Sequence, residues 1–169
     1  MSSIEKLKQL EEAGEHLFHG SPDGTLEVLE PRQSTHTPDL SKPEDTILDG
    51  EPAVSATPYA DFATFRALIN SKNIPFNHSS GFGLNAKGEK RFQISSPELL
   101  DHIKGKTGYV YVFNKDEFKP YDREGEPKEG SNMEWRAHKD VRPVDVVEVN
   151  HEDLPPADKI RIISGQEED

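Results

Sequence analysis

Apolar side chains recur at every third position over residues 4–13, and a glycine, Gly14, follows them. This spacing predicts a short amphipathic helix that ends at Gly14, because glycine readily adopts the left-handed conformation that closes a helix. The same reasoning predicts two more helices. They cover residues 58–70, with Thr57 as the N-cap and Pro58 in the first turn, and residues 96–103.

Short apolar runs between these helices predict strands. The clearest covers residues 108–113, where Tyr109, Tyr111 and Phe113 alternate with two valines. Further strands or extended pieces are predicted over residues 17–20, 26–29, 53–57, 90–95, 132–137, 142–149 and 160–163. We expect Gly81-Phe82-Gly83 to form a turn. Helices and strands do not alternate regularly, as a parallel sheet requires, so the predicted fold class is α+β.

A long segment from Pro31 to Pro52 is rich in Pro, Asp, Ser and Thr and has little periodicity. Connections of this length are unusual inside a compact domain and are often functional loops. An insertion without a function is the alternative that the sequence leaves open.

Composition narrows the classes of function. The chain has 169 residues, a formal net charge of −12 and no cysteine. The absence of cysteine excludes disulfides and thiolate chemistry, and the acidic charge disfavours general binding to nucleic acid. No apolar run has the length of a membrane span, and the first residues lack the core of a signal peptide. We therefore expect a cytoplasmic protein without membrane contact.

Four short motifs carry a resemblance to a known family. They are Leu17-Phe18-His19-Gly20-Ser21, Val54-Ser55-Ala56-Thr57-Pro58-Tyr59, Gly108-Tyr109-Val110-Tyr111-Val112, and Glu134-Trp135-Arg136 followed by Val141-Arg142-Pro143. The chain resembles the ADP-ribosyltransferase-like fold, on the branch with a His, Tyr and Glu signature. That branch includes poly-ADP-ribose polymerases, diphtheria-type toxins and rifampicin-modifying enzymes.

The resemblance implies an architecture and a division of the chain. It implies two small, mostly antiparallel sheets that form a central NAD cleft, with short peripheral helices. Residues 1–15 would form an N-terminal helix, residues 16–155 the ADP-ribosyltransferase-like domain, and residues 156–169 a last strand and an acidic tail.

The resemblance also implies roles for single residues. His19 would bind the adenosine ribose, the backbone of Gly20 would bond the nicotinamide amide, and Ser21 and Ser55 would complete the cofactor site. Tyr59 would stack on nicotinamide, with Phe65 or Phe62 as a second ring. Glu134 would be catalytic, because a carboxylate stabilises the positive charge that develops on the ribose.

Two arginines have roles that the residues themselves suggest. Arg32 is a candidate for binding the pyrophosphate, since a guanidinium grips phosphate with two hydrogen bonds. Arg136 would either pair with an acid or contact a phosphate.

Each assignment has a structural alternative. His19 could simply end a strand beside a turn, and the spacing His16-x-x-His19 points the two rings to opposite faces of a strand, which disfavours a metal pair. Tyr59 could pack on the sheet, and Glu134 could be one surface acid among 32. Trp135 fits core packing better than a ligand platform.

The predicted function is an NAD-dependent ADP-ribosyltransferase that uses NAD as substrate, requires no metal and modifies an unidentified protein or small molecule. One alternative keeps the fold: a nucleotide- or NAD-binding module, an NAD glycohydrolase or an RNA 2′-phosphotransferase. Another is a structural or interaction protein. No nucleotide-binding glycine loop, hydrolase serine motif or zinc-protease motif occurs. We expect His19, Tyr59 and Glu134 to line one cleft.

Overall fold

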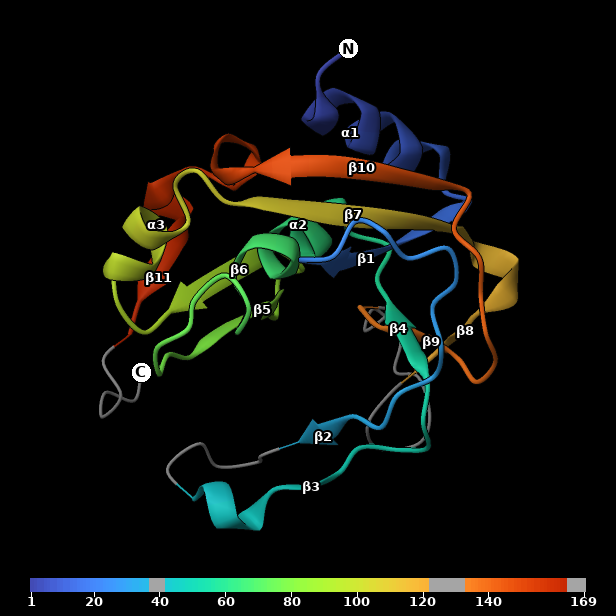
Figure 1. Ribbon diagram of the computed structural model, residues 1–169, viewed down its shortest axis with the longest axis horizontal. Coiled ribbons are helices and arrows are strands. Elements are labelled where there is room, and N and C mark those ends of the chain that lie inside the picture. The colour runs from blue at the N-terminus through green and yellow to red at the C-terminus, as the bar shows by residue number, and fades with distance from the viewer. Residues whose placement is uncertain (37–41, 122–132, 164–169) are drawn as a thin grey trace.

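The computed structural model describes residues 1–36, 42–121 and 133–163 (Figure 1). Within these residues the protein is α+β, with small sheets and few helices, which confirms the predicted class at that level. The α-helices are α1 (Ser3–Ala13), α2 (Ala60–Leu68) and α3 (Glu98–His102). The strands are β1 (His16–Ser21), β2 (Thr35–His36), β3 (Ile47–Leu48), β4 (Val54–Ala56), β5 (Ser80–Leu84), β6 (Lys90–Ile94), β7 (Thr107–Asn114), β8 (Lys119–Pro120), β9 (Trp135–Ala137), β10 (Asp145–Asn150) and β11 (Ile160–Ile162). Four short 3-10 turns are η1 (Pro43–Asp45), η2 (Lys115–Glu117), η3 (His151–Asp153) and η4 (Ala157–Lys159).

The central sheet has the strand order β1-β7-β10, and both pairings are antiparallel. Side chains of a strand alternate between the two faces of its sheet. In β1, Phe18 and Gly20 therefore face one side, and Leu17, His19 and Ser21 face the other. This alternation decides which functional residues share a face.

Helix α2 crosses the Phe18 face of the sheet at two glycines. A Cβ atom at Gly20 would lie 2.0 Å from the carbonyl oxygen of Ala63, and one at Gly108 would lie 2.4 Å from that of Ala67. Only glycine allows such a close approach of helix and strand. The apolar face of α2 packs into the larger core, with Phe62, Phe65 and Leu68 fully buried.

The other face of the central sheet meets a second antiparallel sheet with the order β4-β9-β8 (Figure 1). A smaller buried cluster fills the space between the sheets and includes Leu17, Tyr111 and Phe113 from the central sheet and Val54 and Ala137 from its partner. Phe18 and Thr57 form one isolated antiparallel pair that joins β1 to the chain beyond β4.

A third sheet has the order β11-β6-β5 and corrects one prediction. Gly81-Phe82-Gly83 forms the middle of β5, not a turn. Phe82 stacks on Phe62 of α2 with ring centroids 4.7 Å apart, so long-range aromatic contact stabilises a segment whose two glycines suggest a turn. Its partner β6 agrees with the predicted strand over residues 90–95.

Several other predictions are confirmed or corrected. Helix α1 ends at Gly14 with φ +75°, as its sequence predicts. The predicted N-cap of α2 was wrong. Tyr59, and not Thr57, occupies the N-cap position, and the hydroxyl of Thr57 accepts a hydrogen bond from the Tyr59 amide. Residues 26–29 form only an isolated pair, between Leu29 and Val141, and not a strand.

The predicted strands near the C-terminus are shorter than expected. β9 begins at Trp135, and β10 begins only after Pro143, which cannot donate a ladder hydrogen bond. The loop expected over residues 122–131 and the acidic tail beyond residue 163 lie outside the described residues.

The long segment after Pro31 is not without structure. It contains the antiparallel pair of β2 and β3 and the turn η1. The pair lies apart from the other sheets (Figure 1), and Ile47 and Leu48 on β3 are 54% and 69% exposed. No helix in the described parts of the chain is long and apolar enough to cross a membrane.

The glycine contacts make a testable prediction about stability. We expect Gly108→Ala to lower the free energy of unfolding by about 1–3 kcal/mol or more, because the new methyl group would overlap the backbone of α2. Gly83→Ala is the matched control, since its Cβ would make an ordinary contact 3.9 Å from the sulfur of Met133. Urea unfolding of the two variants measures the difference. Equal stabilities would contradict the close packing of α2 on β7.

Candidate functional site

The site lies where β1 and β4 separate. The backbone N–H and C=O of Phe18 bond those of Thr57 at 2.8 and 2.9 Å. If this ladder continued, Gly20 would pair with Ser55, because hydrogen-bonded pairs recur every second residue. The pairing with β1 stops instead after this single bridge, and β4 itself pairs with β9. The backbone of Gly20 therefore faces the gap between the strands, on the same edge as that of Phe18.

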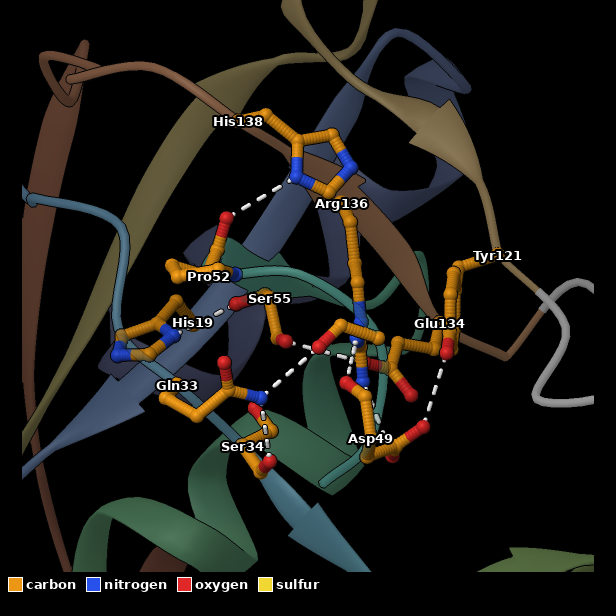
Figure 2. Close-up of polar contacts among 11 residues, drawn as sticks. His19, Gln33, Ser34, Asp49, Pro52, Ser55, Tyr121, Glu134, Arg136 and His138 are labelled. Atoms are coloured by element: carbon orange, nitrogen blue, oxygen red, sulfur yellow. Dashed lines mark hydrogen bonds and ion pairs between the residues drawn. The ribbon is translucent and has the colours of Figure 1, made fainter.

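The imidazole of His19 bonds the backbone carbonyl of Ser55, which would have accepted from Gly20 if the ladder had continued. Its Nδ1 lies 2.7 Å from the carbonyl oxygen of Ser55 (Figure 2). A carbonyl only accepts, so Nδ1 carries the proton, and in the neutral ring Nε2 is an acceptor. Burial lowers the pKa of His19 below its ordinary value, the hydrogen bond to Ser55 opposes this, and the charge of Arg32 adds to it. The ring is thus neutral at pH 7, with Nε2 able to accept a hydroxyl hydrogen.

Ser55 links the histidine to Glu134. While its carbonyl accepts from His19, its hydroxyl donates to Oε2 of Glu134 at 2.9 Å (Figure 2). The Nε of Arg136 donates to the same oxygen at 2.6 Å. The side chain of Glu134 is 31% exposed, and its Oε1 has no hydrogen-bond partner in the described parts of the chain. Among the described residues, Oε2 is therefore held by two donors, and Oε1 has none.

A buried ion pair between Arg136 and Asp49 lies next to Glu134. Arg136 and Asp49 are only 3% and 4% exposed, and the two terminal nitrogens of Arg136 donate to the backbone oxygen of Asp49 at 2.6 Å and to its Oδ2 at 3.1 Å. The guanidinium also stacks on Tyr121, 3.6 Å from the ring centroid, and the Tyr121 hydroxyl donates to Oδ1 of Asp49 (Figure 2). Arg136 thus donates hydrogen bonds to two acids, Glu134 and Asp49.

Electrostatics follow this arrangement. Burial alone lowers the pKa of Arg136, but the hydrogen bond and charge of Glu134 and the charge of Asp49 outweigh it and raise the pKa. Burial also raises the pKa of Tyr121, and its hydrogen bond to Asp49 adds to this. Arg136 remains a cation, and Tyr121 remains a neutral donor. The sequence predicted that Arg136 either pairs with an acid or contacts a phosphate. It pairs with two acids, Glu134 and Asp49.

Two of the predicted aromatic residues do not belong to this hydrogen-bonded group. Phe65 is fully buried in the core against Phe82 and Phe92, so its ring has no surface for a cofactor, and its assignment to the cofactor site is wrong. Tyr59 is half-buried, with its ring edge against Phe62 at 5.3 Å and Lys90 Nζ at 5.5 Å from its centroid. No hydrogen bond or ring contact links Tyr59 to His19, Ser55 or Glu134 within the residues described.

The remaining predicted residues flank the histidine. Ser21 is buried, and its hydroxyl accepts a hydrogen bond from the amide of Asp23, so it shapes the turn after β1. Arg32 is exposed, and its backbone pairs with that of Ala53, which leads into β4. Its charge acts on His19, and its side chain has no ion-pair partner in the described ranges. Arg32 is therefore an exposed cation beside the site, without an ion-pair partner among the described residues.

A cavity of about 440 Å³ lies away from this group of residues. It opens between α1, the start of α2, β6 and the segment from η3 to η4, and its lining includes Leu7, Glu11, Asp61, Lys90 and Phe92. Lys90 connects this cavity to the ring of Tyr59. We place the candidate site at Ser55 and Glu134, because convergent polar groups and not volume alone identify chemistry.

The sequence did not single out two members of the site. Asp49 lies within the long segment after Pro31, and Tyr121 lies directly before residues 122–132. Neither belongs to a local pattern. Gly50 gives the only local signal: it has φ +74°, and a Cβ there would lie 2.8 Å from both Arg136 and the Tyr121 hydroxyl.

Comparisons with known proteins identify no relative: no family model, no curated protein and no solved structure matches this chain. In the described parts of the chain, no group of three or more acids and histidines is arranged to hold a metal ion.

The environment of His19 predicts a pH effect on stability. Because its pKa is lower in the folded protein than in the unfolded chain, the native state binds fewer protons, and stability falls as the pH drops below about 6.5. His19→Gln removes this contribution. We expect the difference in the free energy of unfolding, variant minus wild type, to increase as the pH is lowered from about 7.5 to about 5.5.

Denaturant unfolding at several pH values measures this difference. The other six histidines are common to both proteins and cancel in the comparison. A difference that stays constant with pH would show that His19 is not held in its neutral form.

Proposed function

We propose that the protein is an NAD-dependent ADP-ribosyltransferase with the ADP-ribosyltransferase-like fold, and that NAD binds where β1 and β4 separate. One observation carries the proposal: His19, Ser55 and Glu134, which come from or adjoin three different strands, form one chain of hydrogen bonds. The resemblance assigned cofactor binding to His19 and Ser55 and catalysis to Glu134. Their convergence supports the assignment, since residues 79 positions apart share a hydrogen bond.

The free groups around the gap match the parts of a dinucleotide. Nε2 of neutral His19 would accept a ribose hydroxyl, and the outward-facing backbone of Gly20 would pair with the nicotinamide amide. The exposed guanidinium of Arg32 would bind phosphate. His19 thus supplies a hydrogen-bond acceptor, the backbone of Gly20 a donor and an acceptor, and Arg32 a cation, all within residues 19–32. Tyr59 remains a prediction as the stacking ring.

The proposed reaction breaks the bond between the ribose C1′ and the nicotinamide nitrogen. Nicotinamide leaves with the electron pair, and positive charge develops on the ribose. The carboxylate of Glu134, whose Oε1 has no hydrogen-bond donor among the described residues, would stabilise this charge and accept a hydrogen bond from a ribose hydroxyl. An acceptor nucleophile then forms the new bond at C1′ and loses its proton. With water as the nucleophile, the same site would be a glycohydrolase.

Replacing Glu134 tests the catalytic role. We expect Glu134→Gln to lower the rate of nicotinamide release by about 10²–10³, the range for losing one electrostatic contact in a transition state. NAD⁺ affinity should change little, since the charge that Glu134 opposes barely exists in the ground state. Nicotinamide release measures the rate, and isothermal titration measures the affinity.

Glu148→Gln is the matched control, because Glu148 is an exposed acid on β10 in the same molecule. It should behave as the wild type. His19→Ala should instead weaken NAD⁺ binding. A wild-type protein that binds NAD⁺ but releases no nicotinamide, with water or any acceptor tried, would favour a binding module, and a protein without NAD⁺ affinity would overturn the proposal.

A further inference from the structure

The guanidinium of Arg136 lies between two carboxylates, one at the edge of the site and one inside the protein. Its Nε contacts Glu134 at 2.6 Å, and its two terminal nitrogens contact Asp49. Arg136 and Asp49 are almost completely buried, whereas Glu134 is 31% exposed. The arginine therefore acts on Glu134 in an environment where charges are weakly screened.

A cation next to Glu134 has two opposing effects on the proposed reaction. Its hydrogen bond fixes the carboxylate, together with that of Ser55. Its positive charge also cancels part of the negative charge that Glu134 needs to stabilise a cationic ribose. A lone arginine at this distance would hold the carboxylate but weaken its electrostatic effect. A second acid beside the guanidinium removes this conflict.

We propose that Asp49 is a positioning residue that acts on Glu134 through Arg136. It holds the guanidinium in the orientation in which Nε reaches Glu134, and it offsets the positive charge so that Glu134 keeps its effect on the ribose. This inference rests on the proposed function.

The surroundings of Asp49 fit this role. The stacked ring of Tyr121 and its hydroxyl hold the guanidinium and the Asp49 carboxylate together. Gly50 allows the chain to turn directly over Arg136, where a side chain would overlap the guanidinium. Replacing Asp49 by Asn removes one negative charge next to Arg136, whatever else the carboxylate contacts, and keeps the size of the side chain.

The experiment compares nicotinamide release by Asp49→Asn with that by the double variant Asp49→Asn with Arg136→Gln. We expect Asp49→Asn to lower kcat by about 10- to 100-fold, by analogy with removing the groups that orient the ligands of a metal site. The KM for NAD⁺ should stay within about twofold. The double variant also removes the cation that Asp49 no longer balances, while the Ser55 hydroxyl still donates to Glu134 and holds it, so its kcat should rise above that of Asp49→Asn.

The sign of this second change separates charge compensation from a structural role. If Asp49 only maintained the fold, removing Arg136 as well would lower kcat further. Asp145→Asn is the matched control, because it removes the acid of another ion pair, with Lys6 at 2.7 Å, on β10. Asp49→Glu keeps the charge and should retain more activity than Asp49→Asn. Thermal unfolding and NAD⁺ titration test whether each variant is folded.

The outcomes separate this inference from the proposed function. If Glu134→Gln is inactive but Asp49→Asn equals the wild type, the inference fails and the proposed function stands. A double variant with lower kcat than Asp49→Asn also overturns the inference. If the wild type releases no nicotinamide, the proposed function fails and the inference fails with it.

Discussion

The separation of β1 from β4 after one backbone pair is the constraint on which the candidate site depends. Phe18 and Thr57 join the two strands once, and β4 itself pairs with β9. Because the ladder stops there, Ser55 offers its carbonyl to His19 and its hydroxyl to Glu134. Helix α2 packs closely against the face of β1 at Gly20 and holds this strand in place. A continuous sheet at this point would pair the backbone groups that now face the gap.

Local patterns predicted much of the fold because the decisive residues are neighbours in the sequence. The spacing of three before Gly14 identified α1, and the alternation around Tyr111 identified β7. The strand β5 escaped prediction because its stability comes from Phe82 stacking on α2, which no local pattern reports. The same limit applies to α2. Helical spacing identified its apolar residues but could not tell that Phe65 faces the core completely.

The site was predictable only where a motif marked it. His19, Ser55 and Glu134 each lie in one of the short segments that carry the resemblance, and the structure brings these three together. Asp49 and Arg136 are 87 positions apart, and charge alone could not select this acid among 32. Their pairing follows from where the long segment after Pro31 returns to β4. A buried ion pair depends on the final three-dimensional arrangement, so it is the feature least accessible from the sequence.

The base of the pair formed by β2 and β3 has a consequence for protein engineering. The amide of Asp49 donates to the carbonyl of Ser34 at 3.0 Å, and the side chain of Gln33 donates to that of Gly50 at 2.9 Å. These contacts fix where the chain leaves the domain and where it returns. Extra residues inserted after the end of β2 and before β3 would lengthen a projection that is already closed at its base, at a small entropic cost. This projection is therefore a suitable position for an epitope or a fluorescent reporter next to the site.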